Sequence, residues 1–140
     1  MRLQISNQRV ELARVKEGVD RFAAAHGLPS AVLADLQVSL DEVLSNIISY
    51  GYADAATHEI VIQLAIADGA LHAVIEDDGA PFDPLTVPLP DTGADLSQRA
   101  IGGLGIRFIR ALNDEVRYER AGNRNRLSLR RNLALPPAST

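Results

Sequence analysis

Residues 60–75 consist of two runs of alternating apolar residues, and their spacing predicts a β-hairpin. The turn between the runs is Asp68-Gly69, a dipeptide typical of two-residue hairpin loops because both positions tolerate a positive φ. Residues 116–118 and 127–129 alternate in the same way and predict a second hairpin. Since hairpins join antiparallel strands, the chain is expected to build a sheet that is mixed but mostly antiparallel.

Two segments before the first hairpin have helical spacing instead. Asn7 can cap a helix that runs to about His26, where Gly27 and Pro29 interrupt the pattern. Ser30 can cap a second helix, whose apolar face is formed by Leu33, Leu36, Leu40, Val43, Leu44 and Ile47. A short first strand precedes these helices, and a third helix follows a glycine cluster near residue 103. This order predicts a two-layer α/β sandwich with the helices on one face of the sheet.

The polar side of the second helix carries two side chains that could take part in catalysis or metal binding. Glu42 and Asn46 are four residues apart, so they lie only about 40° apart around the helix and away from its apolar face. A carboxylate can accept a proton, and an amide oxygen is a suitable ligand for Mg²⁺. In isolation such a pair is usually a solvated helix face, so its meaning depends on the rest of the chain.

Two further motifs supply the surroundings of a nucleotide site. Asp77-x-Gly79 follows the second strand of the first hairpin, and an aspartate there can accept a hydrogen bond from an exocyclic amine. Gly102-Gly103-x-Gly105 opens the third helix, where glycines and unpaired helical N–H groups favour phosphate binding. Each motif alone is weak, because turns and flexible loops have the same composition.

Together these motifs resemble those of the anti-sigma-factor serine/threonine kinases, a small branch of the gyrase, histidine kinase and MutL (GHKL) ATPase superfamily. The resemblance runs from about residue 3 to residue 129 and rests on four segments in the family's order. They read LDEVLSNIISYGY, IEDDGAPFDP, IGGLGIRFIRALNDEV and NRLSLRR. It implies a histidine-kinase-like ATPase domain over residues 1–132, followed by a frayed tail at 133–140.

The resemblance also implies a role for each motif in binding ATP and Mg²⁺. Glu42 would be the general base and Asn46 the magnesium ligand. Asp77 would hydrogen-bond the adenine amine, and Gly79 would allow the base to approach closely. Residues 82–101 would form a lid. The phosphates would be contacted by the second glycine motif and by an arginine just before it, namely Gly102, Gly103, Leu104, Gly105 and Arg99.

Two features depart from the family's pattern. Tyr50 stands where related kinases often have a histidine, so a role of that histidine is not expected here. The lid segment is rich in proline, which is expected to alter its motion. The chain has no P-loop and no H-R-D or D-F-G motif, so an ordinary protein-kinase or P-loop fold is excluded.

Composition narrows the expected partners and compartment. The net charge of −4 and the few aromatic residues argue against direct binding of nucleic acid. The chain has no cysteine, no apolar signal-peptide core and no run long enough to span a membrane, so we expect a cytoplasmic protein. Of the clustered arginines from Arg117 to Arg131, we expect most to lie on solvated strand faces.

The resemblance further implies an anti-anti-sigma protein of the sulfate-transporter and anti-sigma-antagonist (STAS) class as substrate. It implies a sigma factor or another output protein as the sequestered partner, and a homodimer. Two alternatives stay open: a non-catalytic ATP-binding module that only switches partners, and the catalytic domain of a histidine kinase. Glu42 argues against the first, because a pure binder needs no base. The absence of an upstream helical hairpin with a phosphorylatable histidine argues against the second.

Overall fold

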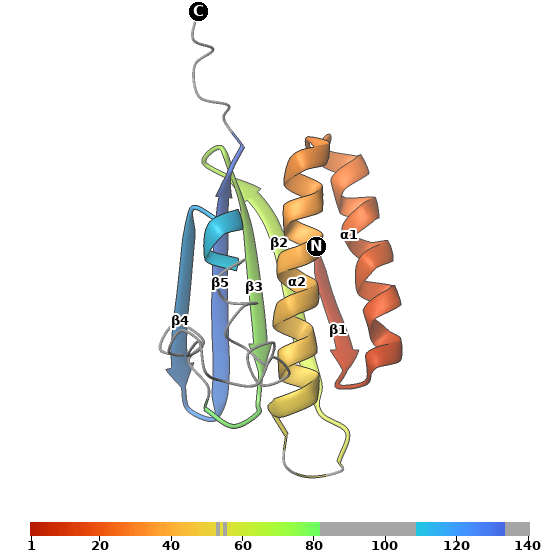
Figure 1. Cartoon of the computed structure of the whole chain (residues 1–140), viewed down its shortest axis with the longest axis vertical. Coiled ribbons are helices and arrows are strands. Elements are labelled where there is room, and N and C mark those ends of the chain that lie inside the picture. The colour runs from red at the N-terminus through yellow and green to blue at the C-terminus, as the bar shows by residue number, and fades with distance from the viewer. Residues whose placement is uncertain (53, 55, 82–108, 134–140) are drawn as a thin grey trace, which may run out of the picture.

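The computed structural model describes residues 1–52, 54, 56–81 and 109–133. A short helix at residues 109–112 precedes the last two strands. The other elements, in chain order, are β1 (Arg2–Ser6), the 3₁₀ turn η1 (Arg9–Glu11), α1 (Leu12–His26), α2 (Ser30–Tyr50), β2 (Glu59–Ala67), β3 (Ala70–Asp77), β4 (Glu115–Ala121) and β5 (Arg124–Asn132) (Figure 1).

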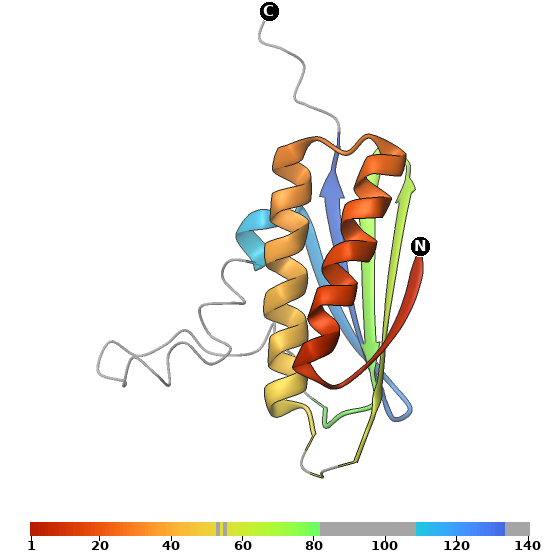
Figure 2. The same ribbon diagram turned by 90° about the vertical axis from the view of Figure 1, so that its right-hand side faces the viewer.

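The strands form one five-stranded sheet in the order β1-β2-β3-β5-β4, and every neighbouring pair is antiparallel. Both long helices lie on the same side of this sheet (Figure 2). The predicted two-layer α/β sandwich is therefore confirmed, and the described strands contain no parallel pair. Among the residues that the structure describes, no helix is long and apolar enough to cross a membrane.

The first hairpin has the predicted turn. Ala67 pairs with Ala70, so only Asp68 and Gly69 lie in the loop between β2 and β3. Their φ angles are 54° and 72°, the left-handed region that a tight hairpin turn requires at both central positions. This turn sets the register of the central strands, because a slip of one residue would move every apolar side chain to the other face.

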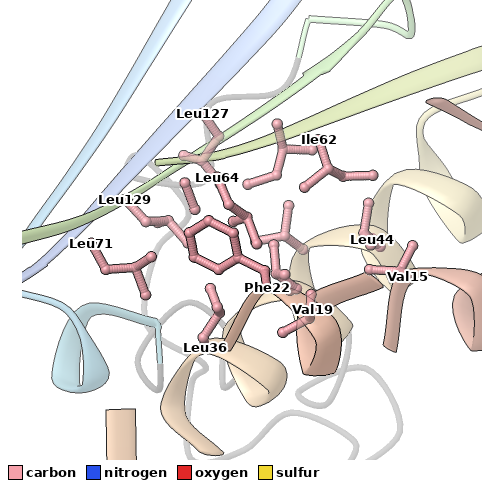
Figure 3. Packing of buried hydrophobic residues seen from close by; sticks show 14 of the residues in the cluster. Val15, Val19, Phe22, Leu36, Leu44, Ile62, Leu64, Leu71, Leu127 and Leu129 are labelled. Atoms are coloured by element: carbon pink, nitrogen blue, oxygen red, sulfur yellow. The ribbon is translucent and has the colours of Figure 1, made fainter. Parts of the chain in front are cut away.

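The core lies between the sheet and the two helices (Figure 3). Phe22 of α1 projects towards the strands, with α2 residues on either side of it. The residues at alternate positions of β2, β3 and β5 face these helices, which explains why each strand has one apolar side. The labelled members of this cluster in Figure 3 are Val15, Val19, Phe22, Leu36, Leu44, Ile62, Leu64, Leu71, Leu127 and Leu129.

The predicted helix caps are wrong at both helices. Asn7 does not cap α1, because η1 intervenes and the helix begins at Leu12. Its side-chain oxygen instead accepts a hydrogen bond of 2.9 Å from the backbone N–H of His58, which ties the end of β1 to the start of β2. Ser30 is already the first residue of α2, and Pro29 occupies the cap position without a side-chain hydrogen bond.

Strand direction brings distant parts of the chain to one end of the molecule. The C-terminal end of α2, the end of β3 and the beginning of β5 all lie at the lower end in Figure 1. Asp77, the last residue of β3, pairs in register with Asn125 at the start of β5. The predicted Asp77-x-Gly79 turn is thus placed close to the end of the helix that carries Glu42 and Asn46.

Candidate functional site

Asp77 ends β3 on the side of the sheet that faces the helices, and it is only 4% exposed. One of its carboxylate oxygens, Oδ1, accepts two hydrogen bonds. The donors are the backbone N–H of Gly79 at 2.8 Å and the side-chain Nδ2 of Asn125 at 3.0 Å. No described residue hydrogen-bonds the other oxygen, Oδ2. Among the described residues, the carboxylate is therefore held through Oδ1 alone.

Gly79 allows the turn after β3 to contact the end of α2. A Cβ atom at this position would lie 2.5 Å from the backbone oxygen of Gly51, far inside any normal contact. The same Gly51 oxygen accepts a hydrogen bond of 2.9 Å from the N–H of Ala80. The close approach that this glycine permits in the structure is therefore to α2, whereas the resemblance had assigned it to a bound base.

Glu42 and Asn46 lie in the C-terminal half of a polar stripe along α2. The polar side chains in the N-terminal half of this stripe already have partners within the chain. Ser39 is fully buried and accepts a hydrogen bond of 3.0 Å from Asn113, while Asp35 pairs with Arg131 at 2.8 Å. Glu42 and Asn46 are half-buried and make no hydrogen bond or ion pair with a described residue. Glu42 also borders the groove between α1 and α2.

The remaining predicted site residues fall outside the described part of the chain. These are Arg99, Gly102, Gly103, Leu104 and Gly105, together with the expected lid at 82–101. Their contacts with phosphate stay predictions. The structure does describe the helix that follows the second glycine motif, from Ile109 onwards, and Ile109 is 1% exposed in the core.

This helix is anchored to its neighbours at its C-terminal end. Asn113 donates to the carbonyl of Ile109 at 2.8 Å as well as to Ser39, and Arg131 donates to the carbonyl of Leu112 at 2.8 Å. These bonds satisfy carbonyls that a helix end otherwise leaves unpaired. They join the end of this helix to α2 and β5, so the segment after the glycine motif packs against the helix that carries Glu42.

A family model described as "Histidine kinase-like ATPase domain" matches residues 5–131 of the chain. The chain belongs to the histidine kinase-like ATPase domain family. Among solved structures, this ATPase domain is similar to the RsbU and RsbW domains of Rv1364c from Mycobacterium tuberculosis. The TM-score is 0.65 at 19% identity, over 97% of this chain and 33% of that one. This likeness supports the fold.

Curated relatives of the ATPase domain are named as kinases. The serine-protein kinase RsbW of Listeria monocytogenes is 26% identical over 121 residues, which cover 84% of this chain and 76% of that protein. The serine/threonine-protein kinase BtrW of Bordetella bronchiseptica is 31% identical over 97 residues, covering 67% of this chain and 66% of that protein. Both similarities agree with the resemblance seen in the motifs.

The structure adds a residue to the candidate site that the motifs did not single out. Asn125 is 7% exposed, and its amide contacts Asp77, Tyr118 and Arg120. A signal was present in the sequence, because Asn125 is in phase with the inward-facing Leu127 and Leu129 of its strand. A buried polar side chain needs a hydrogen-bond partner, and for Asn125 one such partner is Asp77, the predicted adenine-binding carboxylate.

The arginine cluster divides between the two faces of the sheet. Most of its members lie in ion pairs on the face away from the helices, as expected, for example Arg126 with Glu76 and Glu119. Arg120 and Arg131 are the exceptions on the helix-covered face. Arg120 donates to the carbonyl of Gly79 at 2.8 Å and supports the turn after β3.

Polar side chains in the connection between α2 and β2 form a cluster of their own. The His58 ring stacks on Tyr52 with centroids 4.2 Å apart, and its Nε2 lies 2.7 Å from Asp54. Its Nδ1 lies 3.4 Å from Oδ2 of Asp78. The hydrogen bond to Asp54 raises the pKa of His58, against a smaller opposing effect of burial. Burial, and then the charges of Asp77 and Asp78, raise the pKa of Tyr52.

This cluster predicts a pH dependence of stability. The folded-state pKa of His58 is above its ordinary value, so its contribution is fully present below about pH 6.5 and is lost as pH rises through the higher folded value. We expect the unfolding midpoint in urea to decrease over that window, and His58→Gln to remove this part of the decrease. His72→Gln, at a half-buried histidine on β3, is the control. Equal pH slopes for the wild type and His58→Gln would contradict the prediction.

Proposed function

We propose that this ATPase domain is an ATP-dependent serine/threonine protein kinase of the anti-sigma-factor type. The observation that carries the proposal is the docking of Gly51, at the end of α2, onto the turn that contains Gly79. This contact brings the end of the helix that carries Glu42 and Asn46, two side chains without a hydrogen-bond partner among the described residues, to the turn that follows Asp77. The kinase names of the relatives in Listeria and Bordetella support the same activity.

The residues present fit a magnesium nucleotide. The described residues contain no cluster of three or more acidic, histidine or cysteine side chains that could hold a metal by themselves. Mg²⁺ in kinases needs no such cluster, because it is bound by one or two protein oxygens together with water and phosphate oxygens. Asn46 can provide one such oxygen. When bound, the magnesium nucleotide supplies the transferable phosphoryl group and neutralises its charge.

The chain's own residues then perform three tasks. Asp77 accepts a hydrogen bond from the exocyclic amine of adenine through Oδ2. Glu42 accepts the proton of the attacking serine or threonine hydroxyl. The hydroxyl oxygen forms the new bond to the γ-phosphorus as the bond from that phosphorus to the β,γ-bridging oxygen breaks, and ADP leaves. The glycine motif at 102–105 is proposed to surround the phosphates with backbone N–H groups. Positioning and charge stabilisation account for most of the rate of such a transfer.

The proposed protein substrate is a small anti-anti-sigma protein of the STAS class, and the proposed sequestered partner is a sigma factor or another output protein. We also propose a homodimer. These assignments rest on the resemblance to the anti-sigma-factor kinases, with support from the RsbW name of the Listeria relative.

Transfer of label from ATP tests the activity directly. We expect the purified chain, with γ-labelled ATP, Mg²⁺ and a cognate STAS protein, to label that protein on serine or threonine. Chelation of Mg²⁺ should abolish the label. Binding of ATP without any transfer would favour the partner-switching module, and acid-labile label on histidine would favour a histidine kinase domain.

A further inference from the structure

We infer that His58 is a positioning residue for the nucleotide site: in its protonated form it holds the turn after β3 through Asp78, so that nucleotide affinity depends on pH. The inference rests on the proposed ATP site, in which this turn carries the adenine contact of Asp77. His58 lies just before β2 and belongs to none of the motifs of that site. Its effect on the nucleotide is exerted through the turn and not by contact.

The position of His58 is fixed from two sides. Its backbone carbonyl accepts a hydrogen bond of 3.0 Å from the N–H of Asn7, and its own N–H donates to Oδ1 of Asn7 at 2.9 Å. Its ring stacks on Tyr52, which follows the end of α2, with an angle of 15° between the two planes. The imidazole is therefore held by β1 and by the segment after α2, independently of the turn after β3.

Both nitrogens of the His58 ring face carboxylates. Nε2 lies 2.7 Å from Asp54, and Nδ1 lies 3.3 and 3.4 Å from the two oxygens of Asp78. A neutral imidazole has one N–H, so it donates to one carboxylate and turns a lone pair towards the other. The protonated ring donates to both, and the face of Tyr52 also attracts a cation. This geometry favours the imidazolium, in agreement with the raised pKa of His58.

Loss of the proton is expected to break the contact with Asp78. The remaining proton stays on Nε2, because the contact with Asp54 is the shorter of the two. Among the described residues, the titratable groups that face the ring are Asp54, Asp78 and Tyr52, and burial raises the pKa of Tyr52, which stays neutral. No other described side chain hydrogen-bonds the Asp78 carboxylate, whose Oδ1 is buried without a hydrogen bond.

Asp78 stands between the two residues that shape the base site. Asp77 precedes it, and Gly79 follows it with the N–H that holds Oδ1 of Asp77 at 2.8 Å. A half-buried carboxylate that loses its cationic partner is expected to turn towards water, and this movement changes the direction of its neighbour Asp77. The turn keeps its bonds to Gly51 and Arg120, so its binding-competent form becomes less populated but is not lost.

Calorimetric titration with ADP and Mg²⁺, from about pH 6 to about pH 8.5, tests the inference. We expect the wild-type affinity to fall by about 3- to 10-fold relative to His58→Gln over this range, since one hydrogen bond to a charged group is lost. The comparison between variants cancels the titration of the nucleotide's own phosphate. His72→Gln is the control and should keep the wild-type profile.

Asp54→Asn tests the role of the two carboxylates at an exposed position. The amide can donate to Nε2, so a neutral ring then keeps its proton on Nδ1, where it serves Asp78. We expect this variant to bind ADP at about pH 8.5 as tightly as the wild type does at about pH 6. A merely structural role of Asp54 would not produce tighter binding at high pH.

The coupling is reciprocal, so bound ADP should raise the pKa of His58 by about 0.5 to 1, as measured by NMR titration of its ring. Circular dichroism checks that each variant is folded. Equal pH profiles of the wild type and His58→Gln, or a pKa of His58 that ADP leaves unchanged, would overturn the inference. Absence of ADP binding at every pH would instead overturn the proposed ATP site, so the two failures are distinguishable.

Discussion

Glu42→Gln is expected to slow phosphoryl transfer to the partner protein by about 10²- to 10⁴-fold while ATP binding stays close to that of the wild type. The amide keeps the size of the side chain but cannot accept a proton from the attacking hydroxyl. Because Glu42 makes no hydrogen bond or ion pair with a described residue, its replacement leaves no described partner unpaired. The loss should therefore appear in the rate of transfer and not in the free energy of unfolding.

Asp41→Asn is a matched control for this variant, because it removes the same charge one position away, at an exposed site on the same helix. Phosphoryl transfer is measured as label that appears on the STAS protein, and nucleotide binding is measured as the affinity for a non-hydrolysable ATP analogue. If Glu42→Gln and Asp41→Asn transferred phosphate equally well, the carboxylate of Glu42 could not be the general base.

Gly79→Ala is expected to lower the free energy of unfolding by about 1–3 kcal/mol and to remove most nucleotide binding. The added Cβ would lie 2.5 Å from the oxygen of Gly51 and 2.9 Å from Oδ1 of Asp77. The first of these atoms is backbone, so relief requires the turn and the end of α2 to move apart. That movement disturbs the bonds that orient Asp77 and separates it from Asn46.

Gly18→Ala provides the control with the same chemical change. Gly18 lies inside α1, where a Cβ would meet the Sδ atom of Met1 at 3.5 Å, an ordinary contact. Since alanine is favoured over glycine in a helix by about 0.5–1 kcal/mol, this variant should be as stable as the wild type or more so. Urea unfolding and nucleotide titration measure both effects. Wild-type stability for Gly79→Ala would show that the contact with Gly51 is not required.

The positions of the strands and helices were largely predictable from local patterns. The Asp68-Gly69 turn specified a two-residue hairpin, and the alternation in β2 and β3 identified the side that faces the core. The cap at Asn7 was predicted wrongly, because the side chain found a partner in the distant backbone of His58. A capping rule considers only neighbours along the chain, whereas the backbone N–H of His58 lies just before β2, 51 residues away from Asn7.

Within the candidate site, the motifs identified Glu42, Asn46, Asp77 and Gly79 but not the network around them. The contact of Asn125 with Asp77 joins residues 48 positions apart and exists because β3 pairs with β5 in one register. The contact of Gly79 with Gly51 likewise depends on where α2 ends relative to the sheet. No spacing rule connects such residues.

The sequence by itself determined the alternation of apolar residues, the hairpin turn and the residue types able to bind a nucleotide. These are properties of neighbours along the chain, which hydrophobic periodicity and turn chemistry express directly. Only the tertiary structure decided that Asn125 holds one oxygen of Asp77 and that Gly79 meets the end of α2. Strand pairing and helix packing bring these groups together from distant positions, and buried polar atoms then take whichever partners that packing places within reach.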